Sequence, residues 1–446
     1  MTRLFHVYTA FFCLALAQAA GAENSPAEEE AKAKTPQKSD NTESSRQKSL
    51  SGYGDLDQFG SGEGVAGQVR RGDRTVETRH DLNFLADRWK PYFDWKRELQ
   101  DDHGLAFSFN LWLVAQHATD TIEDRKDNAL GGVFRFQGLW TFFNRGGKNS
   151  GRIEWRVERR NGIGNIIPPS QLANNIGVYA LDTGFPYNDK FNWDISVLNY
   201  TQTFGDGGSG FAVGRLAFNS YLDATPFQGL DGGFLNRGLW LNPTLPTVGI
   251  GALGAVGRWS VTDHIRIGAQ IYDGAAQNGS WEWDSWRENK YVTALDLSWA
   301  PSPEDRKNKN IQLTYWAKDS LDQLSEPSSG NGWAMSGIWQ FGKWLPFVRY
   351  GKSNGRSVRS QQSAAIGFRL QRDFDERLQM GFVWSEPSDK KDAPPRDDEY
   401  ALEVSYLYQL SSNLSLTPDI QLVIDPADNP DEDKVWVFGL KLIMSL

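Results

Sequence analysis

The chain has 446 residues, a formal net charge of −9 and a mean hydropathy of −0.53. Such an acidic chain is a poor partner for nucleic acid, and no stretch beyond the N-terminus reaches the ~18 consecutive apolar residues of a membrane-spanning helix. The polar average nevertheless includes 18 Trp, 25 Phe and 44 Gly, a composition that favours short strands and turns over helices.

Residues 1–22 have the pattern of a secretory signal peptide. A basic Arg3 precedes an apolar core from Tyr8 to Ala17, and small residues at Ala20–Ala22 form a cleavage site. The only cysteine, Cys13, lies inside this segment. The exported chain would therefore contain no thiol, which favours a bacterial envelope over an animal extracellular space.

The next segment is charged and poor in apolar side chains. Residues 23–50 contain almost no aromatic or branched apolar residue, and residues 51–75 are rich in glycine. Such segments cannot bury enough apolar surface to offset the entropy of ordering. We therefore predict a disordered leader over residues 23–75.

Residues 76–104 have apolar side chains near helical spacing, including Leu85, Trp89 and Phe93. Pro91 lacks a backbone N–H, so we expect it to start a second helical piece. The pattern predicts a short amphipathic plug or lid.

From Leu105 the apolar period changes to two. In RIEWRVE, for example, Ile153, Trp155 and Val157 alternate with charged residues. Strict alternation is typical of strands with one apolar and one polar face. Such strands are expected at 105–116, 132–143, 152–160, 191–204, 211–218, 247–259, 264–273, 290–300, 310–318, 332–341, 344–351, 363–371, 377–385, 399–409, 414–424 and 435–446.

The spacers between these strands alternate in length. Those in odd positions have ten or more residues and those in even positions have nine or fewer. A soluble β-sandwich, the main alternative fold, has no reason to sort its connections in this way. A transmembrane antiparallel β-barrel does, because its periplasmic turns are short and its outer loops are long. The prediction is an all-β barrel of about sixteen strands over residues 105–446.

The final stretch, KVWVFGLKLIMSL, alternates to the last residue. Trp436 and Phe438 fit an interfacial aromatic girdle, and Leu440 to Leu446 would face lipid. Spanning strands must pair every backbone group, so the last strand is expected to pair with the first.

Four stretches carry a family resemblance: residues 85–109, 211–227, 250–274 and 414–446. The last, with its Thr-Pro-Asp and Gly-Leu, is the most specific. From about residue 82 onward the chain resembles the carbohydrate-selective porin family of the OprB type. The resemblance implies a sixteen-strand porin and a sugar substrate, neither of which follows from periodicity alone.

A porin selects solutes by the width of its lumen and by the polar groups at the narrowest point. Arginines and carboxylates on opposed ladders would suit a neutral polyhydroxylated solute, because they donate and accept hydrogen bonds without trapping an ion. They could equally be ordinary solvated side chains that pair across strands. The pore-lining candidates are Arg152, Glu154, Arg156, Glu158, Asp194, Arg215, Asp296, Arg349 and Arg369.

Two loops add further candidates. Trp281, Trp283 and Trp286 could capture sugars on their aromatic faces, or could simply pack their loop. The spacer 219–246 could narrow the pore if it folds inward. Its candidates are Tyr221, Asp223, Phe227, Asp231, Arg237 and Trp240.

We therefore expect an outer-membrane porin for passive diffusion of small neutral carbohydrates into the periplasm. A general diffusion porin with weak ion preference is the alternative, and a polysaccharide exporter should have a more cationic lumen. The histidines lack metal-ligand spacing, and no GxSxG or Walker motif occurs. We expect no enzyme, cofactor or metal; an enzyme would take His117 as its first candidate base.

The expected partners are small carbohydrates and outer-membrane lipid. The family resemblance makes a homotrimer the assembly to test.

Overall fold

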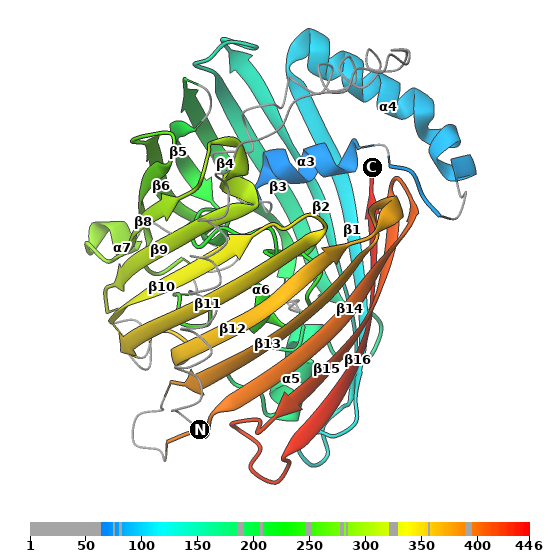
Figure 1. Cartoon of the computed structure of the whole chain (residues 1–446), viewed down its shortest axis with the longest axis vertical. Helices are drawn as coiled ribbons and strands as arrows, with labels where there is room; N and C mark the ends of the chain where they lie inside the picture. Colours follow the sequence, from blue (N-terminus) through cyan, green and yellow to red (C-terminus); the bar gives the residue numbers. More distant parts are fainter. Residues whose placement is uncertain are drawn as a thin grey trace, which may run out of the picture. The chain divides into compact units, whose positions relative to one another are not determined.

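The computed structural model describes residues 64–74, 76–79, 83–184, 191–205, 208–246, 251–276, 281, 284–320, 329–355, 357–388 and 395–446, all within one compact unit, Leu50–Leu446. Sixteen antiparallel strands form a closed barrel (Figure 1), as predicted. They are β1 (Leu105–Ala118), β2 (Asn128–Phe143), β3 (Gly151–Gly162), β4 (Phe191–Phe204), β5 (Ser209–Leu216), β6 (Ala252–Ser260), β7 (Ile265–Asp273), β8 (Tyr291–Trp299), β9 (Lys309–Lys318), β10 (Gly330–Trp339), β11 (Trp344–Gly355), β12 (Ser360–Gln371), β13 (Arg377–Pro387), β14 (Glu399–Ser411), β15 (Leu414–Ile424) and β16 (Lys434–Ser445).

The barrel closes between its first and last strands. β1 pairs with β16 in register from Asn110 opposite Ser445 to Ala118 opposite Val437. Beyond the ladder, Phe109 and Leu446 exchange backbone hydrogen bonds of 2.7 and 2.8 Å. No sheet edge is left along this seam, as an apolar surrounding requires.

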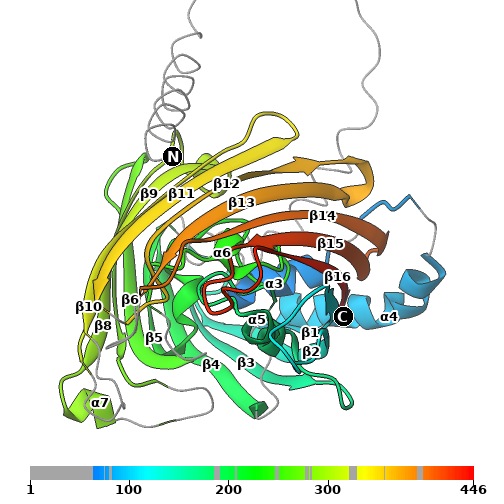
Figure 2. The same ribbon diagram turned by 90° about the horizontal axis from the view of Figure 1, so that it is seen from below.

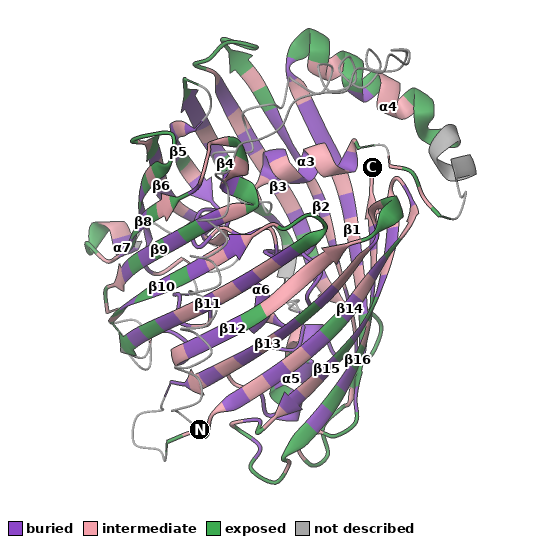
Figure 3. Cartoon of the chain, in the orientation of Figure 1, coloured by how far each residue is buried: buried purple, intermediate pink, exposed green. Residues whose placement is uncertain are grey.

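The two faces of the strands differ in exposure, as Figure 3 shows in alternating bands. On β16 the outward Trp436, Phe438 and Leu440 are 44–46% exposed, whereas the inward Val437 and Lys441 are fully buried. The outer surface is therefore apolar and aromatic. Inside, polar and charged side chains lie beside an apolar cluster that inward residues such as Val437 form with the connections folded into the barrel.

The connections follow the expected alternation, except that three in odd positions have fewer than the expected ten residues: 119–127 and 425–433 have nine each, and 356–359 has four. At the end of the barrel where β1 begins, turns such as 340–343 and 412–413 are short; we call it the short-turn end. The opposite end carries long connections such as 163–190 and 217–251. The β11–β12 connection there contains only residues 356–359, because both strands extend beyond their predicted ends.

The N-terminal region differs from the expected leader. Helix α3 (Val65–Gly72) lies within the stretch predicted to be disordered. Its Val65, Ala66 and Val69 are buried against inward residues of the barrel wall. These few apolar residues in a glycine-rich stretch are too sparse to predict a helix without the wall. The expected signal peptide, residues 1–22, lies outside the described residues.

Helix α4 (Asn83–His103) is continuous through Pro91, contrary to the predicted break. It lies beside the rim of the barrel, near the start of β1 (Figure 2), so α3 rather than α4 enters the short-turn end. Smaller helices are α5 (Pro169–Ile176), η3 (Phe218–Ser220), α6 (Arg237–Trp240), α7 (Asp284–Arg287), η4 (Glu304–Lys307) and η5 (Asp373–Asp375). None of the helices in the described ranges has both the length and the apolar run needed to cross a membrane.

Candidate functional site

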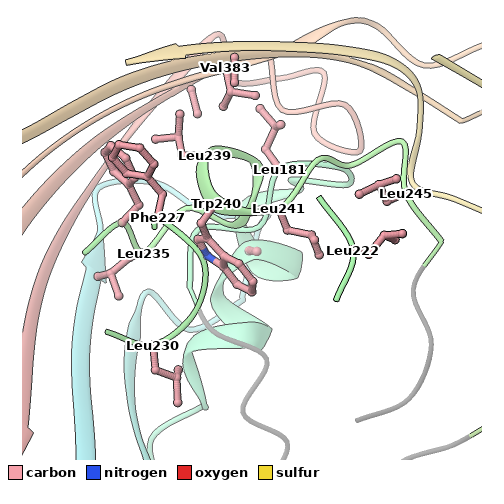
Figure 4. Packing of buried hydrophobic residues seen from close by; sticks show 14 of the residues in the cluster. Leu181, Leu222, Phe227, Leu230, Leu235, Leu239, Trp240, Leu241, Leu245 and Val383 are labelled. Carbon is pink, nitrogen blue, oxygen red and sulfur yellow. The ribbon is translucent and has the colours of Figure 1, made fainter. Parts of the chain in front are cut away.

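Two long connections fold into the barrel. One carries α5, and the other, residues 217–246, carries η3 and α6; we call the latter the inserted loop. Figure 4 shows its Phe227, Leu235, Leu239 and Trp240 packed together inside, with Leu239 next to Val383 of β13. The candidates at 219–246 could narrow the pore only if this segment folded inward, and it does.

Charged side chains of β11–β16, the anchoring wall, hold the backbone of the inserted loop. The Glu403 carboxylate accepts hydrogen bonds of 2.7 and 2.8 Å from the N–H groups of residues 235 and 236. The Lys441 ammonium donates to the carbonyls of residues 230 and 233 at 3.3 and 2.9 Å. These charge-assisted bonds satisfy backbone groups that have no ladder partner.

Two of the nine pore-lining candidates belong to this wall. Arg349 donates to the carbonyls of residues 238 and 239. Arg369 donates to those of residues 226 and 232, at 3.1 and 2.7 Å. Both guanidiniums hold the loop, a use that strand alternation could not reveal.

The other inserted connection is held in the same way. Glu399 accepts hydrogen bonds of 2.6 and 2.8 Å from the N–H groups of residues 179 and 180, which follow α5. A third, of 3.0 Å, comes from the N–H of residue 427. One buried carboxylate thus ties two connections to the wall.

Charges on β2–β5, the ion-pair wall, bind one another instead. Arg152 lies 2.6 Å from Glu154, and Glu158 lies between Arg135 at 2.6 Å and Arg160 at 3.1 Å. All five side chains are buried. Each carboxylate offsets a neighbouring guanidinium, so the charges on this wall compensate one another locally.

The remaining strand candidates are also engaged. Arg156 donates to Gln137 at 2.8 Å, and Arg215 lies 3.2 Å from Asp194. Asp296 accepts hydrogen bonds from side chains of β7 and β9. The structure therefore places all nine candidates inside, most of them in polar networks rather than as separate solvated groups.

The candidates of the inserted loop lie inside the barrel too. The Tyr221 carbonyl accepts a 2.8 Å hydrogen bond from Gln270. Asp223 is buried 3.9 Å from the Arg349 guanidinium, and Arg237 lies 3.5 Å from Asp182.

The tryptophans of the loop between β7 and β8 lie in different surroundings. Trp281 is 43% exposed, and the Arg215 guanidinium lies 4.6 Å from the centroid of its ring. Trp286 contacts Tyr291 edge to face at 4.9 Å and so packs its own loop. Trp283 lies outside the described residues.

Burial and neighbouring charges shift the pKa values of ionisable side chains in the inserted loop. It raises the pKa of the Asp223 carboxyl, against the attraction of Arg349. Burial and the nearby Arg359 lower the pKa of Arg237 to about 10, although Asp182 opposes them. For Asp231, burial is outweighed by Arg71 and the Trp112 indole N–H, and its pKa lies below the ordinary value.

Sequence reasoning missed several residues that organise the interior. The alternation already placed Arg135, Glu403 and Lys441 on the polar face of their strands, which was the available signal. Asp182 and Gln68 lie outside any strand, and nothing in the local pattern marks them. No group of His, Cys, Asp or Glu in the described ranges could hold a metal ion. His117, the candidate base, is half exposed beside Asp127.

Comparison with known proteins gives a family match at the C-terminal end. Residues 338–446 match the sequence model described as carbohydrate-selective porin, OprB family. Two curated relatives are similar over a longer stretch. Porin AaxA of Chlamydia felis is 25% identical over 71% of this chain and 73% of its own length, and that of Chlamydia abortus is 24% identical over 68% and 67%.

Solved structures show the same fold. The high-pH structure of Pseudomonas putida OprB has a TM-score of 0.64 at 14% identity, over 83% of this chain and 99% of that one. The outer-membrane channel DcaP of Acinetobacter baumannii has a TM-score of 0.51 at 8% identity, over 77% and 97%.

Porins form channels, so the match to this family confirms that the chain is not an enzyme. The family and the barrel fold also imply the outer membrane, with the short-turn end toward the periplasm. The predicted resemblance is confirmed by sequence over residues 338–446 and by fold over most of the barrel, and the chain is a porin similar to the carbohydrate-selective OprB type.

Proposed function

We propose that this porin passes small neutral carbohydrates selectively and passively into the periplasm. The observation that carries the proposal is the pairing on the ion-pair wall, where three carboxylates hold four guanidiniums in contact and a fifth guanidinium donates to Gln137. Such a surface offers many donors and acceptors, and most of its charges are already paired, which suits a hydroxyl-rich neutral solute better than an ion.

The best-placed first contact is the group of Trp281, Arg215 and Asp194. The exposed indole offers an apolar face to a sugar ring, and the buried Arg215–Asp194 ion pair beside it holds the indole in place through a cation–π contact. We propose that a sugar stacks on Trp281 before it passes the inserted loop.

Planar-bilayer recordings test this function. Glucose and sucrose should reduce the single-channel current in a saturable way, and Trp281→Ala should raise the half-blocking concentration. Trp286→Ala, in the same loop but packed on Tyr291, is the matched control. A current that ignores both sugars would identify a general diffusion porin instead.

Assembly as a homotrimer stays a prediction. Chemical crosslinking of the porin in native membranes would test it.

A further inference from the structure

Helix α3 places one side-chain oxygen in a cradle of donors. The Gln68 Oε1 atom accepts from Gln137 Nε2 at 2.7 Å and from Arg135 and Arg156, each at 3.2 Å. All four side chains are at most 2% exposed. Three donors from two adjacent strands converge on a single neutral oxygen, a geometry that recognises a hydroxyl or carbonyl oxygen.

The cradle is held by the ion-pair wall itself. The Arg135 Nε atom donates to Glu158 at 2.6 Å, and the Arg156 Nε atom donates to Gln137 Oε1 at 2.8 Å. Each donor is thus oriented by a contact that does not involve α3. The site would keep its shape if the Gln68 side chain left it.

An acceptor and an aromatic ring lie beside the donors. Asp231 of the inserted loop accepts from the Trp112 indole and from Arg71 of α3, both at 2.8 Å. The Arg135 guanidinium lies 5.1 Å from the centroid of the Trp112 ring. Donors, a carboxylate and an indole together are what a sugar ring requires.

The helix fits this site incompletely. The Gln68 Nε2 atom is buried and has no hydrogen-bond partner in the part of the chain that the structure describes. The apolar contact of α3 with the wall is limited to Val65, Ala66 and Val69 against small or branched inward residues. A ligand that left no buried donor without an acceptor would therefore compete with α3 on favourable terms.

We propose that Arg135, Gln137, Arg156 and Asp231 form a sugar subsite about midway along β2 and β3, and that α3 occupies it as a tethered competitor. Gln68 takes the place of a sugar oxygen, and Arg71 takes the place of a hydroxyl donor. The inference rests on the proposed function. It adds a second sugar site and a segment of the chain that regulates it.

The first test removes the competitor. In bilayers, the double variant Gln68→Ala/Arg71→Ala should lower the half-blocking glucose concentration by about threefold or more, because less of the subsite is occupied by the helix. Arg74→Ala is the matched control, since Arg74 follows the same helix but pairs with Asp375 at a turn. An unchanged half-blocking concentration in a folded double variant would overturn the proposal.

The second test locks the competitor in place and does not weaken its contacts. A Cβ atom on Gly72 would lie 3.5 Å from that of Ser108, which is within disulfide range. In Gly72→Cys/Ser108→Cys, oxidation should raise the half-blocking glucose concentration, and dithiothreitol should restore it. The two single-cysteine variants serve as controls, and a lock without effect would contradict the tethered competitor.

The two proposals fail in different ways. Loss of saturable block in every protein, wild type included, would end the sugar-selective function and the subsite with it. Saturable block in the wild type that neither α3 variant changes would overturn the subsite alone.

Discussion

The two walls of the barrel interior use the same residue types for different purposes. On the ion-pair wall, the Glu158 carboxylate binds both Arg135 and Arg160. On the anchoring wall, Glu403 and Lys441 bind the backbone of the inserted loop. Charge on the first wall pairs with other side chains, whereas charge on the second holds backbone that shapes the pore. Residue type and strand face therefore do not by themselves identify a solute-binding charge.

Breaking the ion-pair wall should have the largest effect. Glu158→Ala leaves Arg135 and Arg160 buried without their shared carboxylate, and should reduce the free energy of unfolding by about 3–5 kcal/mol. Urea unfolding in detergent, followed by gel mobility, would measure it. Glu154→Ala leaves only Arg152 without its carboxylate, so it should reduce the free energy of unfolding by less. Equal losses would show that the paired charges do not act as a triad.

Weakening the anchoring wall should loosen the loop more than the barrel. Glu403→Gln replaces one acceptor oxygen with a donor, and should lose about 1.5–3 kcal/mol of local stability at residues 235–236. Limited proteolysis should cut within 217–246 faster than in the wild type. Glu399→Gln should instead expose the connection after α5. Cleavage at the same site in both variants would refute separate anchors.

The contact of α3 with the inserted loop should depend on pH in a defined direction. The pKa of Asp231 is lowered by Arg71 and Trp112 despite burial, so its ion pair is fully present above the ordinary aspartate pKa of about 4. It is lost only as pH falls through the lower pKa of the folded protein. Hydrogen exchange of residues 65–72 should therefore quicken only in stronger acid. Asp231→Asn should remove that dependence, and its persistence would point to another group.

A pair at the rim should matter least. Arg359 is partly exposed and lies 3.0 Å from Asp182, which Arg237 also contacts. Solvent screens such a pair, so Arg359→Gln should change the free energy of unfolding by less than about 1 kcal/mol. A thermal melt in detergent would check it. A large loss would mean that the rim belongs energetically to the buried walls.

The sequence predicted the barrel closely, because a strand with one lipid-facing side has an apolar residue at every second position. The strand at 414–424 has the predicted bounds, and the predicted face of β16 is the exposed one. Twin constraints, apolar outside and polar inside, leave little freedom in register.

The interior could not be predicted to the same depth. Arg349 and Arg215 both occupy inward positions, yet one holds a loop backbone and the other an aspartate. That difference depends on where residues far apart in sequence come to rest. Helix α3 was missed for the same reason, since its apolar residues have meaning only against Ala106, Leu139 and Val197 of the wall.

The seam between β1 and β16 sets a condition on biogenesis. β16 supplies two ladders at once, one to β15 and one to β1, so fifteen strands without it would present two unpaired edges. Neither edge tolerates hydrocarbon, and both would template aggregation in the periplasm. Completion of the wall therefore depends on β16, because only with β16 in place do β1 and β15 both have a partner on each side.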